Sequence, residues 1–190
     1  MRLIFGDPPA APGPPAGAGW RRMPALGPKR IQNYGLLVSL GGMLLVGALL
    51  RGAIRPSSLW TTIGLLLIVL PLHELIHALA TPGWGSSRHT ILGVQRGKGL
   101  LLPYMTYTDS QPVGHMLLTG LAPLLLLSVL PVILILLAPL GPALRADLGF
   151  LAFFNMAISG GDLVNFFLIF QQIPRGARVQ GVGWALYWRA

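Results

Sequence analysis

The sequence predicts an all-α integral membrane protein with about four transmembrane helices and a short β-hairpin-like cytoplasmic loop between the second and third helices. Hydrophobic residues make up 53% of the 190-residue chain and charged residues only 10%. Soluble domains carry roughly 25% charged residues, so this composition favours a membrane protein. The chain has no cysteine, which excludes disulfides, thiolate nucleophiles and zinc sites built from cysteine.

The two ends of the chain are predicted to be tails. Residues 1–33 are rich in proline, glycine and alanine, as in the run DPPAAPGPPAGAG. This composition is typical of flexible segments, so we expect a disordered cytoplasmic tail there. Residues 172–190 are expected to form a second, C-terminal cytoplasmic tail. The transmembrane domain is therefore predicted to span residues 34–171.

Four apolar segments are predicted to cross the membrane as helices, at residues 34–50, 58–81, 114–140 and 147–171. The first is the shortest, yet it reaches roughly 26 Å at ~1.5 Å per residue. In the second, Pro71 either kinks the helix or is an ordinary membrane-helix proline. In the fourth, Gly160 and Gly161 predict a backbone break or a close approach of two helices.

The loop at residues 82–113 contains two segments with strand-like composition, HTILGVQ and LLLPYMTYT. Both are rich in β-branched or aromatic residues, and Arg96-Gly97-Lys98-Gly99 joins them, which predicts a hairpin. The hairpin is either a plain connector or an edge to which an extended peptide can add as a strand.

Basic residues indicate how the helices are oriented. Lys and Arg number eleven in the two tails and the 82–113 loop, and three in the other two loops. By the positive-inside rule, the chain is a multi-pass protein of the cell membrane with both termini in the cytoplasm. The basic residues that give the formal charge of +9 are thus explained by their role in orienting the membrane helices. No aromatic-interleaved basic motif is present, so no nucleic-acid partner is expected.

The second apolar segment contains His73-Glu74-Leu75-Ile76-His77, an H-E-x-x-H motif, and Glu74 is the sole glutamate of the chain. On a helix, positions i and i+4 share one face, so His73 and His77 can both bind one Zn²⁺. Glu74 can then act as the general base toward a water molecule at that metal. Ionisable residues inside a membrane segment are functional candidates in their own right.

A zinc site of this kind needs a third protein ligand. The candidates are Asp109, Asp147, Asp162, His89 and His115. Measured from the cytoplasmic ends of their segments, His73 and Asp162 both lie roughly 12–14 Å deep at ~1.5 Å per residue. Asp147 falls at the opposite surface, and the others are shallower or in the loop. Asp162 is therefore the expected third ligand.

With these residues, the chain resembles the intramembrane zinc metalloproteases of the site-2 protease type. It resembles more closely the small bacterial membrane proteins of the "putative zincin peptidase" family. The N-x-x-x-S-x-G-D-like segment of that family is matched by Asn155, Ser159, Gly161 and Asp162, and its I-P-x-G-A-type stretch by residues 173–177. The resemblance covers residues from about 60 to 190.

The resemblance implies an intramembrane zinc metalloprotease that hydrolyses peptide bonds of membrane-associated protein or peptide substrates, with the lipid bilayer as its surroundings. Asn155 or Asn165 would then be a candidate hydrogen-bond donor to the oxyanion. Two other classes stay open. One is a non-catalytic metal-binding membrane protein, either a pseudoprotease or a regulator. The other is a transporter or structural protein in which the same charges form a buried polar cluster.

The distribution of basic residues predicts the topology in a directly testable way. A reporter that is active only in the cytoplasm should work when fused at the C-terminus or within residues 82–113. It should fail at residues 51–57 and 141–146, because those loops carry few basic residues and face the other side. Cytoplasmic signal from either of these short loops would contradict the four-span topology.

Overall fold

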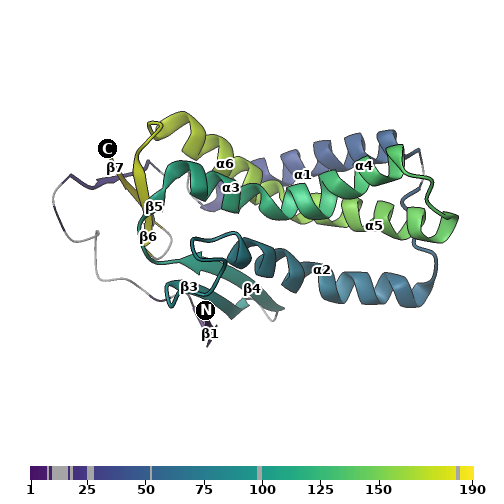
Figure 1. The fold of residues 1–190 in the computed structure, drawn as a ribbon, viewed down its shortest axis with the longest axis horizontal. Coiled ribbons are helices and arrows are strands. Elements are labelled where there is room, and N and C mark those ends of the chain that lie inside the picture. The colour runs from purple at the N-terminus through teal and green to yellow at the C-terminus, as the bar shows by residue number, and fades with distance from the viewer. Residues whose placement is uncertain are drawn as a thin grey trace. The chain divides into compact units, whose positions relative to one another are not determined.

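The computed structural model describes residues 1–7, 9, 17, 19–24, 28–51, 53–97, 100–182 and 185–190. These residues form two compact units. The helical unit comprises Pro28–His73 and Leu121–Asn165, and the sheet unit comprises Met1–Gly27, Glu74–Gly120 and Phe166–Ala190. Helices α2 (Leu59–Leu79), α3 (Val113–Leu124) and α6 (Gly160–Gln172) each continue from one unit into the other (Figure 1).

The helical unit is built around α1 (Pro28–Leu50), which packs along α5 (Pro142–Ile158). Helix α4 (Leu130–Leu137) also packs against α5. Their shared core consists of the buried side chains Val46, Leu50, Ile135, Ala152 and Met156. This core packs along α5, which carries Asn155, a residue that contacts His73 of the candidate site.

The connection between α1 and α2 is fixed by local hydrogen bonds. Arg51 has a φ of 45°, a left-handed conformation that ends α1. The Ser58 hydroxyl oxygen accepts the backbone N–H of Thr61 at 3.0 Å, which caps the start of α2. The backbone N–H and hydroxyl of Ser57 donate to the two carboxylate oxygens of Asp147 at 2.7 and 2.9 Å. Asp147 therefore ties this connection to α5.

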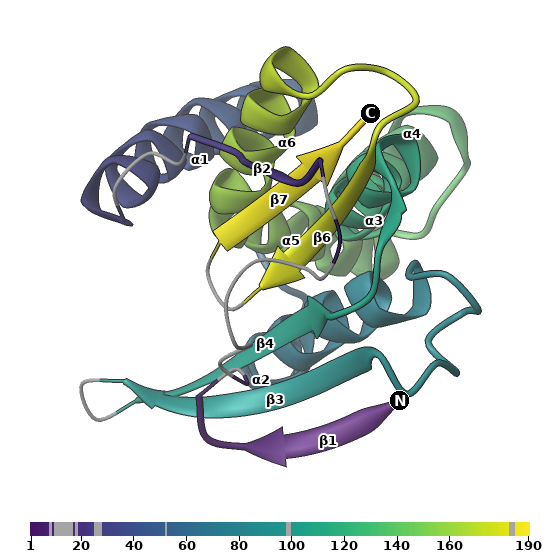
Figure 2. The same ribbon diagram turned by 90° about the vertical axis from the view of Figure 1, so that its left-hand side faces the viewer.

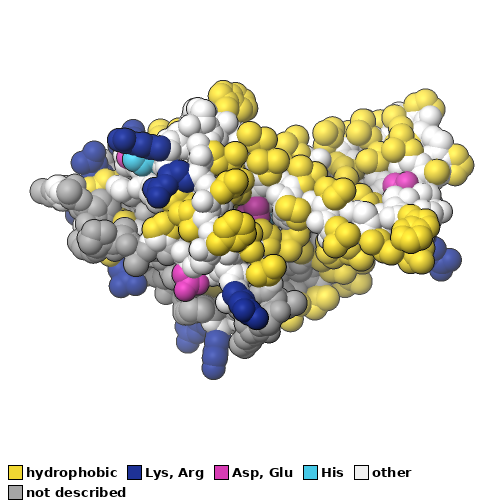
Figure 3. All heavy atoms as spheres, turned by 90° about the horizontal axis from the view of Figure 1, so that it is seen from below, with side chains coloured by type: hydrophobic (Ala, Val, Ile, Leu, Met, Phe, Trp, Pro, Cys, Tyr) yellow, Lys and Arg dark blue, Asp and Glu magenta, His cyan; other side chains and the backbone are white. Residues whose placement is uncertain are grey.

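Among the residues that the structure describes, three helical segments are long and apolar enough to cross a membrane: Lys29–Leu50, Leu59–Leu79 and Val113–Leu137. The last combines α3, a π-helical turn, η1 (Leu125–Val129), and α4. Helices α5 and α6 make a fourth if the bent pair is one span. Hydrophobic side chains cover the helices on the face drawn in Figure 3. Leu44, Leu67 and Leu137, for example, are 76%, 70% and 81% exposed. These features indicate a multi-pass membrane protein.

The fourth predicted segment is two helices rather than one. Helix α5 ends at Ile158. Ser159 caps it, with its backbone N–H donating to the Asn155 carbonyl at 3.0 Å, and α6 begins at Gly160. The two helix axes differ in direction by 55°. The break predicted from the two glycines is therefore present.

Gly160 also allows the predicted close approach of two helices. A Cβ atom at Gly160 would collide with the Gly35 carbonyl oxygen and the Ser39 hydroxyl of α1. The Ser39 hydroxyl donates to the Ala157 carbonyl at 2.7 Å across the same contact. Neighbouring Gly161 differs, because a Cβ atom there would meet nothing within 4 Å. Gly160 thus brings α1 directly against the start of α6.

A three-stranded sheet in the sheet unit has the order β1-β3-β4. Strands β3 (Thr90–Gly97) and β4 (Leu100–Tyr107) pair antiparallel, which confirms the predicted hairpin, although residues 98–99 at its turn lie outside the described residues. Strand β1 (Arg2–Phe5) pairs parallel with β3 (Figure 2). The cytoplasmic location of the hairpin stays a prediction.

Tyr104 of β4 helps to hold the end of β1 against this sheet. Its ring covers Gly93 on the neighbouring strand, where a Cβ atom would collide with the ring. Its hydroxyl donates to the carbonyl of Gly6, just after β1, at 3.1 Å. Burial of the phenol, with a smaller contribution from the nearby Asp7 carboxylate, raises the pKa of Tyr104 above its usual range, so the hydroxyl stays protonated as the donor.

The second sheet has four strands in the order β2-β7-β6-β5, with all neighbours antiparallel. The strands are β2 (Arg21–Arg22), β5 (Gln111–Pro112), β6 (Arg178–Val182) and β7 (Ala185–Arg189). Val179 of β6 is fully buried against Ile169 and Ile173 at the end of α6, and against Val113 at the start of α3. The core of the sheet unit therefore joins this sheet to two helix ends.

The two sheets correct the prediction of an all-α fold. Strands β1 and β2 lie within residues 1–33, and β6 and β7 within residues 172–190, where the composition predicted tails. Their backbone groups pair with strands far away in sequence, and local composition carries no sign of such pairing. Residues 8, 10–16, 18 and 25–27 of the predicted N-terminal tail lie outside the described residues.

The contact at Gly160 predicts different effects for two neighbouring substitutions. Gly160→Ala should destabilise the protein by about 1–3 kcal/mol or more, because its Cβ atom must displace the backbone and Ser39 of α1. Gly161→Ala is the matched control and should melt close to the wild-type temperature. Thermal unfolding in detergent measures both. Equal melting temperatures for the two variants would show that the α1–α6 contact is not tight.

Candidate metal centre

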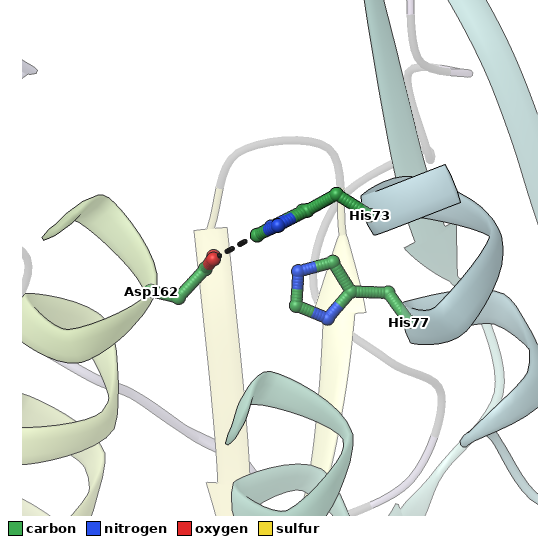
Figure 4. A group of neighbouring side chains, drawn as sticks. All are labelled: His73, His77 and Asp162. Carbon is green, nitrogen blue, oxygen red and sulfur yellow. Dashed lines mark hydrogen bonds and ion pairs between the residues drawn. The ribbon is translucent and has the colours of Figure 1, made fainter. Parts of the chain in front are cut away.

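Helix α2 brings the two histidines of the H-E-x-x-H motif onto one face. The helix continues from Leu59 through Pro71 to Leu79, so His73 and His77 lie one turn apart. Both imidazoles are buried, at 3% and 6% exposure. Figure 4 shows the two rings side by side on α2. Helix geometry therefore places the two side chains on one face of α2.

Asp162 lies in the first turn of α6, directly after the break. Its carboxylate oxygen Oδ2 is 3.0 Å from Nε2 of His73, as the dashed line in Figure 4 marks. The amino end of a helix carries partial positive charge, which stabilises a carboxylate placed there. The break between α5 and α6 therefore places Asp162 next to His73, and the new helix start stabilises the charge of its carboxylate.

His73, His77 and Asp162 form a candidate metal site. One ligand atom from each lies within 4.8 Å of the other two. In a tetrahedral zinc shell with Zn–N distances of ~2.0–2.1 Å, ligand atoms are about 3.3 Å apart. Small side-chain movements bridge that difference. Two imidazoles and one carboxylate are also a donor set that zinc accepts, so these residues fit a zinc ion.

Hydrogen bonds determine which histidine nitrogens face this site. Nδ1 of His77 lies 2.8 Å from the carbonyl oxygen of Thr119. A carbonyl oxygen only accepts, so Nδ1 carries a proton, and in the neutral ring the lone pair is then on Nε2. Histidine ligands of metals usually donate their second N–H in this way, which fixes the ring orientation.

Asn155 makes the corresponding contact to His73. Its side-chain oxygen Oδ1 lies 2.8 Å from Nδ1 of His73. Its amide nitrogen donates to the carbonyl of Pro123 at 3.2 Å and to the hydroxyl of Ser128, in the π-helical turn, at 2.8 Å. The amide is fully buried and already engaged. Its contacts therefore fit a buried structural amide better than an oxyanion donor. Asn165, the other candidate, is exposed on α6.

Two hydrogen-bond acceptors face each other in this arrangement. When Nδ1 of His73 holds the ring's one proton, both Nε2 and the Asp162 carboxylate present lone pairs at 3.0 Å. Two lone pairs at this distance repel each other unless a proton or a cation lies between the two atoms. A divalent metal ion satisfies both atoms. The donor chemistry of the site is thus consistent with a metal.

Glu74 lies one residue after His73 on α2 and is half-buried. Its carboxylate is carried by the same rigid helix as the two histidines. The helix therefore sets the position of Glu74 relative to the two histidines, and a general base needs such a defined position next to the metal.

The other candidate ligands lie elsewhere. Asp147 is bound to Ser57, as described above. His89 has its Nε2 atom 4.0 Å from the exposed Asp109 carboxylate, and His115 donates from Nε2 to the Ala80 carbonyl at 2.9 Å. Within the part of the chain that the structure describes, these residues belong to no group of three potential ligands.

Two supporting contacts were not predicted. The Thr119 carbonyl is a backbone group, which leaves no mark in the sequence. The contact of Asn155 with His73 was detectable in part, because Asn155, Ser159 and Asp162 are spaced by four and three residues. In the continuous helix expected from the sequence, that spacing puts the three residues on one face.

A family model described as "Putative zincin peptidase" matches residues 66–177 of the chain. The match covers more than half of the sequence and includes both the H-E-x-x-H motif and Asp162. Comparisons with curated proteins and with solved structures gave no match.

Proposed function

Because the chain belongs to the family described as "Putative zincin peptidase", we propose that it is an intramembrane zinc metallopeptidase of the site-2 protease type. It hydrolyses peptide bonds of membrane-associated proteins or peptides. The observation that carries this proposal is the cluster of His73, His77 and Asp162 on apolar helices, with Glu74 next to the first histidine. Both termini and the β3–β4 hairpin face the cytoplasm.

Each residue of the site has a separate role. His73, His77 and Asp162 would hold Zn²⁺, the histidines through Nε2, and the hydrogen bonds on both Nδ1 atoms orient the rings. A zinc ion held there would act as a Lewis acid toward the scissile carbonyl and the attacking water.

Glu74 transfers the proton. Its carboxylate accepts a proton from the attacking water and then gives it to the nitrogen of the leaving amine, so that the peptide bond breaks without an unstable amide anion leaving. The apolar helices around the site limit the access of bulk water, which strengthens the electrostatic interactions of these groups.

The ligand set predicts a specific pattern of zinc loss. Purified wild-type protein should contain about one zinc ion per chain. His73→Ala, His77→Ala and Asp162→Ala should each lose most of it, since each removes one of three protein ligands. His89→Ala and His115→Ala are matched controls and should keep it. Full zinc content in Asp162→Ala would exclude Asp162 as the third ligand.

If Glu74 is the general base, a substitution there should strongly reduce peptide cleavage without reducing zinc binding. Glu74→Gln keeps the size of the side chain but cannot accept the proton of water. It should leave zinc content and melting temperature almost unchanged and lower the cleavage rate by at least roughly 10²-fold. The substrate is first found by screening single-span membrane reporters with wild-type protein.

Two results would contradict this mechanism. Cleavage at the wild-type rate by Glu74→Gln would rule out Glu74 as the base. Zinc bound to the wild type without cleavage of any reporter in the screen would instead favour a non-catalytic metal-binding membrane protein.

A further inference from the structure

Asn155 is fully buried in the helical unit, and its environment fixes the orientation of its amide. The Pro123 carbonyl can only accept a hydrogen bond, so the atom 3.2 Å from it must be the amide nitrogen. The hydroxyls of Ser128 and Ser159 donate their own protons to the carbonyls of Ala152 and Asn155, at 3.1 and 2.8 Å. Their oxygens therefore act as acceptors toward the same nitrogen.

This orientation decides the state of His73. With the nitrogen facing three acceptors, the remaining atom Oδ1 must face Nδ1 of His73, at 2.8 Å. An amide oxygen cannot donate, so Nδ1 of His73 has to carry a proton for the hydrogen bond to form. The proton on Nδ1 leaves Nε2 as the nitrogen that can bind a metal.

A competing arrangement lies close by. Nε2 of His73 is 3.0 Å from the Asp162 carboxylate, so a proton on Nε2 alone would give a good hydrogen bond. In that tautomer the two candidate ligands bind each other and Nδ1 has no proton to donate. The Asn155 oxygen would then face a lone pair inside a buried site, which is unfavourable.

We propose that Asn155 is a positioning residue that holds His73 with its proton on Nδ1 and so prevents His73 and Asp162 from closing on each other through a proton on Nε2 alone. The inference rests on the proposed metal site. The two histidines differ in what sets the position of the ring proton. The backbone carbonyl of Thr119 sets the tautomer of His77, whereas a replaceable side chain sets that of His73.

Nitrogen NMR of metal-free protein labelled with ¹⁵N-histidine tests the proposal directly. The chain has four histidines, so the signals can be assigned with His77, His89 and His115 variants. In the wild type, Nδ1 of His73 should carry a proton. In Asn155→Leu, which has a similar volume but no acceptor, that proton should move to Nε2. If the wild-type spectrum shows no proton on Nδ1 of His73, the proposal is wrong, whatever the variants show.

Asn155→Asp separates positioning from simple packing. It removes the same amide hydrogen bonds to Pro123, Ser128 and Ser159 as the leucine variant does, but it keeps an oxygen acceptor toward His73. It should therefore keep the Nδ1 proton. Ser128→Ala removes one acceptor of the Asn155 amide and should keep the signature too. Asn165→Leu, at an exposed position of α6, is the matched control for the leucine substitution.

Zinc affinity, measured by competition with a chelator, gives the second readout. Asn155→Leu should bind zinc roughly 10–100-fold more weakly than wild type, and Asn155→Asp should stay within a few-fold. Equal loss of zinc in both variants, with the Nδ1 proton retained in both, would mean that Asn155 acts only through packing. A wild type that binds no zinc but shows the Nδ1 proton would refute the metal site while leaving the role of Asn155 intact.

Discussion

The site depends on an imidazole and a carboxylate that face each other 3.0 Å apart, on helices whose other side chains are nearly all apolar. A carboxylate in such surroundings is unfavourable unless neighbouring groups compensate its charge. The amino end of α6 is one such group, and a metal ion between the carboxylate and Nε2 of His73 would be another. The break between α5 and α6 places Asp162 at a helix start, and the hydrogen bond of His73 with Asn155 holds the His73 ring next to it.

The break between α5 and α6 meets this constraint. A straight helix through residues 142–172 would have no free amino end near Asp162, and its backbone N–H groups there would be bonded within the helix. Ending α5 at Ile158 and turning by 55° creates a new helix start at Gly160, two residues before Asp162. Gly160 lets α1 pack directly against this turn, because a side chain there would collide with Gly35 and Ser39.

Helix α2 carries the remaining groups of the site. His73, Glu74 and His77 lie within two turns of one continuous helix, so their spacing depends on no loop and on no packing of separate elements. The hydrogen-bond acceptors of the two rings come from other helices, Asn155 on α5 and the Thr119 carbonyl on α3. The proposed zinc peptidase chemistry therefore combines a rigid motif on one helix with ring orientations fixed from outside that helix.

The sequence by itself determined the apolar segments, the hairpin and the H-E-x-x-H motif, because helical period, strand composition and motif spacing are local properties. It also led to Asp162, since matching depths along two membrane segments needs only the rise per residue. Tertiary structure alone decided the strands near the two ends of the chain, whose pairing partners are distant in sequence. It also decided how Asn155, Ser128 and the Thr119 carbonyl surround the histidines. Amide orientation and the proton position on a ring depend on which donors and acceptors face each other across helices, and no local pattern records that.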